Sequence, residues 1–172
     1  MSTSKEIVIQ DACILFDLID LGLIDTFFEL NVTVMTTPQV IGEIEEVEQI
    51  QKVAEFTSVK KLIIDEEGLL DHVDKLFGEN KGLSYTDCSV LELALRKRGI
   101  LLSSDWKLRT ASVRSNLTVR GVLWIIEELC EKKILSLEQA LQKLSLYPKL
   151  NQRAPKNEIE KLISKLKNSN TI

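Results

Sequence analysis

Residues 6–22 read EIVIQDACILFDLIDLG, and the pattern of apolar residues changes within this stretch. Residues 6–9 form a short apolar run that is typical of a buried strand, whereas residues 12–22 carry apolar side chains at helical spacing. Asp11 lies at the junction. The stretch therefore predicts a strand that leads directly into a helix, with a carboxylate between them.

The same alternation continues along the rest of the chain. We expect further strands over residues 32–35, 62–64, 100–103 and 117–119. We expect further helices over residues 25–30, from Pro38 past Glu43, and over 66–77, 84–98, 106–115, 122–132, from 137, and 159–166. Strands that alternate with helices imply a parallel sheet covered on both faces. The sequence thus predicts a three-layer α/β/α fold with a central parallel sheet of four to five strands.

Length and composition limit the class of protein. A chain of 172 residues suits a compact domain, and we expect that domain over residues 1–147. Pro148 and Pro155 are expected to bracket a connector, so residues 148–172 are predicted to be a connector and a helix added to the domain. No apolar run approaches the ~20 residues that span a bilayer. Without a signal peptide, and with three scattered cysteines, the chain is expected to be cytoplasmic with free thiols.

Four carboxylates follow predicted strands or begin predicted helices. Asp11 follows the first strand, Asp105 follows the strand over 100–103, Asp87 lies in a first helical turn, and Glu43 lies on the helix after the second strand. Sites in open parallel sheets form beyond the carboxyl ends of the strands. We therefore expect these four side chains to reach one pocket.

A hard cation explains why a protein would gather four acids. Like charges in a partly buried site repel one another and raise carboxylate pKa values. Mg²⁺ offsets this repulsion, because it prefers oxygen ligands. Such an ion activates water and polarises a phosphoryl oxygen, which is the chemistry of phosphodiester hydrolysis.

Each acid also has a structural explanation, which the sequence leaves open. Asp11 and Asp105 fit helix caps, and Asp87 fits a first-turn acid that complements the helix dipole. Glu43 fits a solvated acidic run with Glu45 and its neighbours. The cluster over residues 65–67 is interpreted as a helix start and is not assigned to the site.

The two parts of the chain carry opposite charge. Residues 1–95 contain 19 acids and 6 bases, and residues 96–172 contain 7 acids and 16 bases. This asymmetry fits a basic surface for a polyanion beside an acidic site. On charge alone, the preferred explanation is a fold whose two halves neutralise each other through ion pairs.

Four motifs together resemble the PIN-domain family. The motifs are IVIQDACIL at 7–15, TPQVIGEI at 37–44, LSYTDCSVLELA at 83–94 and LLSSD at 101–105. Their order and spacing agree with the family over residues 7 to about 120. The run over 109–123 further resembles a PIN subfamily described only as a domain of unknown function.

The resemblance implies a nuclease fold with Mg²⁺ or Mn²⁺ at the site and single-stranded RNA as substrate. It implies that Asp11, Glu43, Asp87 and Asp105 are the catalytic and metal-binding acids and that Ser103 supports them. Many relatives are toxins of the VapC type, so an antitoxin protein is an expected partner. Cys13 stands where the family commonly has Asn or Ser. Lys107 stands where it often has a further acid or Asn, which leaves one or two metal ions open.

Two further expectations concern partners. Phosphate contacts are expected from Lys107, Arg109 and Arg114, and also from Arg96, Lys97 and Arg98. The apolar residues over 122–132 predict an outward-facing surface and hence a homodimer; the alternative is that they pack inside the chain. The rival to a ribonuclease is a PIN fold that acts as a binding or scaffolding module with little or no catalysis.

Overall fold

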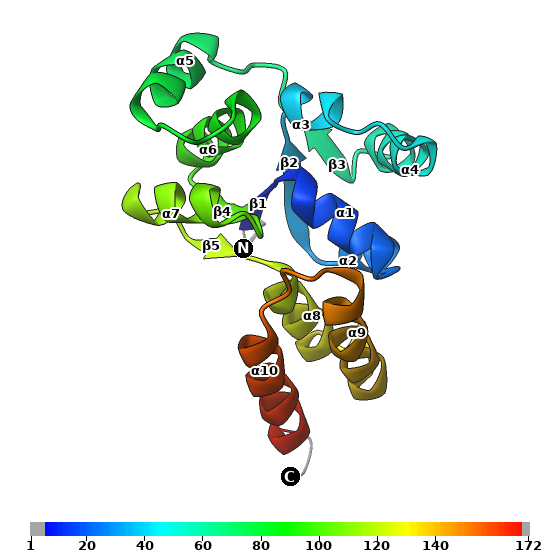
Figure 1. The fold of residues 1–172 in the computed structure, drawn as a ribbon. Helices are drawn as coiled ribbons and strands as arrows, with labels where there is room; N and C mark the ends of the chain where they lie inside the picture. Colours follow the sequence, from blue (N-terminus) through cyan, green and yellow to red (C-terminus); the bar gives the residue numbers. More distant parts are fainter. Residues whose placement is uncertain (1–5, 170–172) are drawn as a thin grey trace, which may run out of the picture. The chain divides into compact units, whose positions relative to one another are not determined.

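The computed structural model describes residues 6–169 and contains one parallel sheet (Figure 1). Five strands lie in the order β3-β2-β1-β4-β5, and every pair is parallel. The strands are β1 (Glu6–Gln10), β2 (Val32–Thr36), β3 (Leu62–Ile64), β4 (Ile100–Leu102) and β5 (Val119–Arg120). Helices surround this sheet, which confirms the predicted α/β/α class and the upper strand number.

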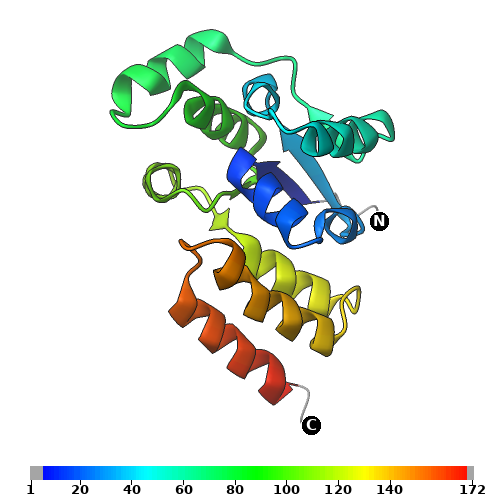
Figure 2. The ribbon, with the colours of Figure 1, turned by 45° about the vertical axis from the view of Figure 1, so that its right-hand side comes forward.

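The chain divides into two compact units, and the sheet belongs to the first, residues 6–16 and 31–120 of the described chain. Its helices are the start of α1 (Ala12–Asp20), α3 (Pro38–Gly42), α4 (Val47–Ser58), α5 (Leu70–Glu79), α6 (Tyr85–Lys97) and α7 (Trp106–Arg114). One buried cluster joins Ile9 and Leu101 of the sheet to Leu91 of α6 and Leu108 of α7. In Figure 2, α6 lies between α5 and the sheet.

Helix α6 ends at Lys97, with Arg98 as its C-terminal cap. Arg98, not Gly99, takes the left-handed conformation that closes the helix, with φ of 52°. Gly99 is needed because a Cβ there would lie 3.0 Å from the carbonyl oxygen of Ile7. A side chain at this position would therefore push β4 away from β1.

The second unit comprises residues 17–30 and the described part of residues 121–172. It contains the end of α1, α2 (Ile24–Phe27), α8 (Val122–Glu131), α9 (Leu137–Leu150) and α10 (Lys156–Ser169). Helices α8, α9 and α10 lie side by side (Figure 2). A capping box begins α9, with Ser136 and Gln139 exchanging hydrogen bonds.

Two expectations for this unit were wrong. Helix α9 continues through Pro148, because Tyr147 and Asn151 donate hydrogen bonds of 2.8 and 3.0 Å to the carboxylate of Asp17 and hold the last turn. The division at residue 148 stays a prediction, but it falls inside a helix. Ile125, Ile126 and Leu129 of α8 are fully buried and Leu123 and Trp124 partly so. The outward-facing surface that suggested a homodimer is therefore not there.

No helix within residues 6–169 is both long and apolar enough to cross a membrane.

Candidate active site

The carboxyl edge of the sheet carries a row of buried polar side chains. The register aligns Ile9 with Met35 and Leu101, and Met35 with Ile63. Side chains alternate between the two faces of a strand, so a residue and the one two positions after it share a face. We apply this to the four aligned residues Ile9, Met35, Ile63 and Leu101. The residues two positions after these four, in the order of the strands, are Asp65, Thr37, Asp11 and Ser103. All four are at most 6% exposed, and we call them the carboxyl row.

Within the carboxyl row, the carboxylate of Asp11 accepts three hydrogen bonds. Its Oδ1 accepts the backbone N–H of Ala12 at 2.7 Å, and its Oδ2 accepts the hydroxyl of Ser103 at 2.8 Å and the thiol of Cys13 at 3.1 Å. Burial raises the pKa of Asp11, these three hydrogen bonds lower it, and the charge of Asp87 raises it by the smallest contribution. We expected repulsion between like charges to be the main cause of a raised pKa at this site, but for Asp11 burial is the main cause.

Cys13 supplies a neutral donor to this carboxylate. Burial, and then the charge of Asp11, raises the pKa of its thiol to about 12. The sulfur also accepts the backbone N–H of Ser104 at 3.2 Å. Cys13 therefore makes the hydrogen bonds of a small polar residue, and it stays protonated in the physiological range.

Ser103 links two of the predicted acids. Its hydroxyl donates to Asp11 and accepts the backbone N–H of Asp105 at 3.0 Å. Asp105 caps α7, because its Oδ1 accepts the backbone N–H of Leu108 at 2.9 Å. A carboxylate has a second oxygen, so this cap leaves Oδ2 able to bind a ligand.

Asp87 begins α6 in a capping box. Its Oδ2 accepts the backbone N–H of Ser84 at 2.7 Å, and its own N–H donates to the hydroxyl of Ser84 at 3.0 Å. Asp87 is half-buried, and its charge acts on Asp11. The structure thus gives Asp87 the helix-terminal role that the sequence left open.

Glu43 lies apart from these hydrogen bonds. Helix α3 ends at Gly42, and Glu43 is its exposed C-terminal cap. The expectation that this helix carries Glu43 was wrong, because Gly42 is a poor helix former and the following acids repel one another. A separate helix, α4, begins at Val47 and was not predicted.

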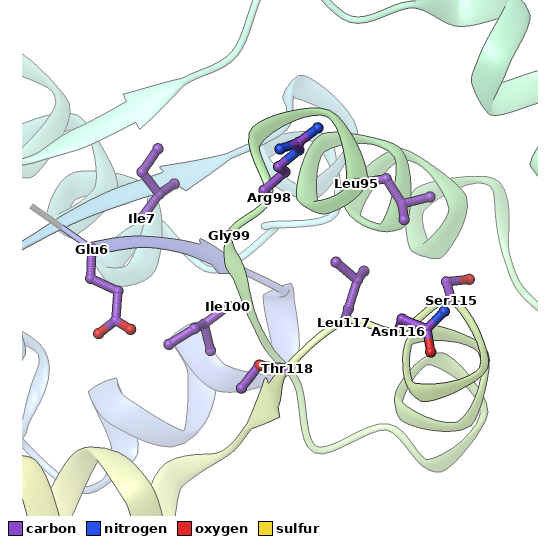
Figure 3. Close-up of a pocket in the computed structure, with 10 residues that line it drawn as sticks. All are labelled: Glu6, Ile7, Leu95, Arg98, Gly99, Ile100, Ser115, Asn116, Leu117 and Thr118. Carbon is purple, nitrogen blue, oxygen red and sulfur yellow. The ribbon is translucent and has the colours of Figure 1, made fainter. Parts of the chain in front are cut away.

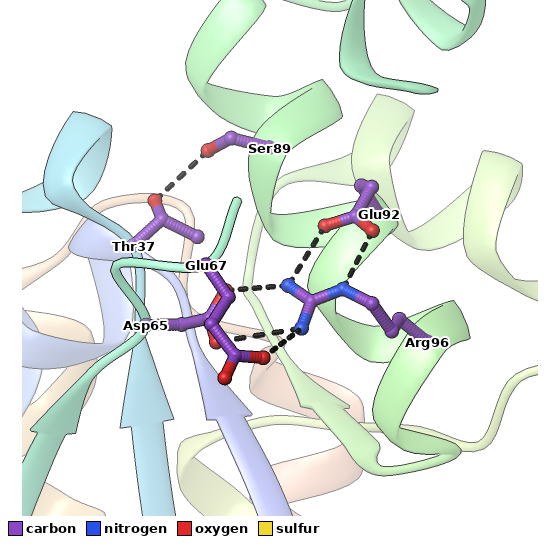
Figure 4. Close-up of polar contacts among 6 residues, drawn as sticks. All are labelled: Thr37, Asp65, Glu67, Ser89, Glu92 and Arg96. Carbon is purple, nitrogen blue, oxygen red and sulfur yellow. Dashed lines mark hydrogen bonds and ion pairs between the residues drawn. The ribbon is translucent and has the colours of Figure 1, made fainter. Parts of the chain in front are cut away.

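Arg96 is part of a buried ion cluster and not a surface phosphate contact as expected (Figure 4). Its Nε and one terminal nitrogen donate to the two oxygens of Glu92 at 2.8 and 3.1 Å. The same guanidinium pairs with Asp65, and Glu67 lies 3.9 Å away at the exposed side. Hydrogen bonds from Glu92 and then Asp65 raise the pKa of Arg96 further above its ordinary value.

Asp65 was missed by sequence reasoning. It was interpreted as a helix start, but α5 begins only at Leu70 and Asp65 directly follows β3. Its position after a strand, which it shares with Asp11, was the signal that could have identified it.

The other basic residues that were expected to contact phosphate differ in whether their side chains are exposed or bonded within the protein. Lys107 and Arg114 are exposed on α7. Arg109 instead donates to the carbonyl oxygens of Ser103 and Arg120 at 2.5 and 3.1 Å, so it joins the ends of β4 and β5. Trp106, which sequence reasoning overlooked, is 77% exposed directly after Asp105.

The donor chemistry of the site suits a hard cation, although its ligands are not preassembled. Within residues 6–169, no group of three or more His, Cys, Asp or Glu side chains is placed to hold a metal ion. Mg²⁺ keeps several waters and is often bound through one or two carboxylates. Asp11, with the oxygen of Asp87 or Asp105 that its helix cap does not use, would have the donor atoms for such a site.

A separate hollow lies at the opposite edge of the sheet (Figure 3). Its volume is about 670 Å³. The lining residues are Glu6, Ile7, Leu95, Arg98, Gly99, Ile100, Ser115, Asn116, Leu117 and Thr118. These residues surround the amino ends of β1, β4 and β5, so this hollow is not formed by the carboxyl row.

Comparisons with known proteins agree on the fold. Residues 7–168 match the model of a family described as a PIN domain. The crystal structure of PAE2754 from Pyrobaculum aerophilum is similar, with a TM-score of 0.54 and 17% identity, over 73% of this chain and 98% of that chain. At this identity the likeness shows the fold alone. No curated protein matches this chain by sequence.

Proposed function

The chain belongs to the PIN-domain family, whose members are in general nucleases, and on that premise we propose that it is a metal-dependent endoribonuclease. The observation that carries the proposal is the environment of Asp11. This carboxylate is 5% exposed, and within residues 6–169 it forms no ion pair with Lys, Arg or His. A buried carboxylate without a counter-ion is costly unless a cation arrives with the ligand.

Asp11, Asp87 and Asp105 are proposed to hold Mg²⁺ or Mn²⁺. The ion would supply Lewis-acid stabilisation of a phosphoryl oxygen and an activated water. Ser103 and Cys13 orient Asp11 through hydrogen bonds to Oδ2, and the backbone N–H of Ala12 fixes Oδ1. Glu43 is exposed on the loop after α3, and we propose that it binds the ion through a water molecule.

Substrate contacts are proposed beside Asp105. Lys107 and Arg114 are exposed and can neutralise phosphates of RNA. The exposed ring of Trp106 offers a face on which an unpaired base can stack, which favours single-stranded RNA. Arg109 supports this surface by joining the strand ends and is not proposed to contact phosphate.

The toxin role and the antitoxin partner are proposals that rest on the family alone. The homodimer was expected from an outward-facing apolar surface over residues 122–132, and with those residues buried it is not proposed. The binding or scaffolding alternative is favoured by one observation: Asp87 and Asp105 both serve as helix caps. A scaffold needs these caps and has no use for the metal.

A cleavage assay on a panel of structured and single-stranded RNAs, with Mg²⁺, Mn²⁺ or EDTA, tests the proposal. The key variant is Asp11→Asn. Its matched control is Asp17→Asn, because Asp17, in α1, is also a buried carboxylate whose pKa is raised by burial. We expect metal-dependent cleavage by the wild type and by Asp17→Asn and none by Asp11→Asn. Cleavage that survives EDTA, or equal loss in both variants, would contradict the proposal.

A further inference from the structure

A chain of hydrogen bonds connects the start of α3 to the start of α6, and Figure 4 shows its central link between Thr37 and Ser89. The backbone N–H of Val40 donates to Thr37 Oγ1 at 3.2 Å, and the hydroxyls of Thr37 and Ser89 are 2.8 Å apart. Ser89 Oγ donates to the carbonyl oxygen of Thr86 at 2.7 Å. Each hydroxyl has one proton, so Thr37 must be the donor to Ser89. Both buried hydroxyls then donate once and accept once.

The chain ends next to a proposed metal ligand. Thr86 is the residue before Asp87, and Thr37 is level with Asp11 in the carboxyl row. The pair of Thr37 and Ser89 therefore ties the first turn of α6 to the strand that neighbours β1. We call this contact the hydroxyl tie.

The Arg96 cluster provides a second attachment of the same helix. Glu92 and Arg96 lie on α6, and Asp65 follows β3 in the carboxyl row. Glu92 and Asp65 are at most 6% exposed. A helix held at two places along its length can neither slide nor rotate freely against the sheet.

We propose that the hydroxyl tie and the Arg96 cluster are positioning elements that set Asp87 against Asp11. Thr37, Ser89 and Arg96 are thus positioning residues of the proposed nuclease site. This inference rests on the proposed function for the role of Asp87 and on geometry alone for the tie. It explains why the polar residues Thr37, Asp65, Ser89 and Glu92 are all buried beside the site.

Ser89→Ala is the sharpest test, and the chain offers a matched control. Ser112→Ala removes another buried serine of the same unit, which also donates to a carbonyl of its own helix at 2.7 Å. Only Ser89 additionally contacts Thr37. Thr37→Val breaks the same tie from the other side, and Thr37→Ser keeps the hydroxyl.

Amide hydrogen exchange and Mn²⁺ binding are the two measurements. A net hydrogen bond of about 1 kcal/mol corresponds to a factor of about five. In Ser89→Ala and Thr37→Val we expect exchange at Asp87 and Cys88 to be about fivefold faster than in Ser112→Ala. We expect the dissociation constant for Mn²⁺, measured by electron paramagnetic resonance on the whole protein, to rise by a similar factor in the same two variants. Thr37→Ser should resemble the wild type in both measurements.

The results separate the tie from the function. Equal exchange in Ser89→Ala and Ser112→Ala overturns the tie. Faster local exchange with unchanged Mn²⁺ affinity overturns its role in positioning the site. If the wild type neither binds Mn²⁺ nor cleaves RNA, the proposed function fails, and the exchange data alone decide whether the tie fixes α6.

Discussion

Asp11 and Asp65 occupy equivalent places on two strands of one sheet, but their surroundings are opposite. Both follow a strand on the same face, and they are 5% and 6% exposed. Asp65 meets the guanidinium of Arg96, whereas Asp11 meets a hydroxyl, a thiol and a backbone N–H. Asp65 thus has a cationic partner inside the protein, which it shares with Glu92, and the charge of Asp11 is only solvated by neutral donors.

This difference distinguishes two reasons for burying a carboxylate. A paired acid fixes the structure and resists further chemistry, because its counter-ion is already present. An unpaired acid raises the energy of the unliganded state and gains when a cation binds. The two acids could not be told apart from their own sequence neighbours, since the decisive partner of Asp65 lies 31 residues away.

The largest effect is expected from removing the counter-ion of Asp65. Arg96→Met leaves Asp65 and Glu92 as buried carboxylates without a cation, so we expect a loss of about 3–5 kcal/mol in the free energy of unfolding. Urea denaturation measures it. Replacing all three residues at once, with Asp65→Asn and Glu92→Gln added, should restore most of the stability. A loss below about 1 kcal/mol for the single variant would show that Asp65 is no better paired than Asp11.

Neutralising Asp11 is expected to have the reverse consequences. Asp11→Asn should lower the rate of RNA cleavage by at least about 100-fold, because changes outside a metal's direct ligands already cost 10–100-fold. In EDTA the same variant should melt higher than the wild type, because a buried charge has been removed. Thermal melts and single-turnover cleavage measure the two effects. A lower melting temperature in EDTA would indicate that Asp11 is as structural as Asp65.

The pH dependence of stability sharpens the same contrast. The pKa of Asp11 is raised from its ordinary value of 3.8, chiefly by burial, so the folded state binds this proton more tightly than the unfolded chain does. The resulting stabilisation is complete below pH 3.8 and is lost as the pH rises through the folded pKa. The melting advantage of Asp11→Asn in EDTA should therefore grow over that range and vanish with millimolar Mg²⁺. An advantage that is constant with pH would contradict burial of the charged form.

The stability change expected for Asp87→Asn lies between the loss expected for Arg96→Met and the gain expected for Asp11→Asn. Repulsion of like charges alone would make Asp87→Asn melt higher without metal, but Asp87 makes the smallest contribution to the pKa of Asp11 and also caps α6. We now expect a change within about 0.5 kcal/mol in EDTA and a smaller gain on adding Mg²⁺. Asp71→Asn, in the first turn of α5, is the matched control. An equal gain in both variants would exclude Asp87 as a ligand.

Local patterns were sufficient for most of the fold. Alternating runs predicted the strands and the parallel sheet, and motif spacing placed Asp11, Ser103 and Asp105 at one edge. What failed depends on tertiary partners. Pro148 stays helical because Asp17, far away in sequence, binds the residues around it, and Arg96 is internal because Asp65 follows a strand. The end of α3 at Gly42 could have been predicted from local sequence, because the glycine and the acidic residues that follow it disfavour a longer helix.

The smallest expected effect concerns the basic residues beside the site, which extend the comparison from acids to cations. Arg109, like Arg96, is engaged inside the protein, whereas Lys107 and Arg114 are exposed. Arg109 was expected to contact phosphate, but Arg109→Ala should mainly lower the melting temperature by releasing the ends of β4 and β5. Lys107→Ala and Arg114→Ala should each weaken RNA binding uniformly across sequences. Each should reduce the slope of log affinity against log salt by about 1. Fluorescence anisotropy across a salt series measures this slope, with EDTA present to prevent cleavage. If Arg109→Ala alone changed the slope at an unchanged melting temperature, Arg109 and not Lys107 would be the phosphate contact. Hydrogen bonding of a charged side chain within the protein would then no longer indicate that its role is structural.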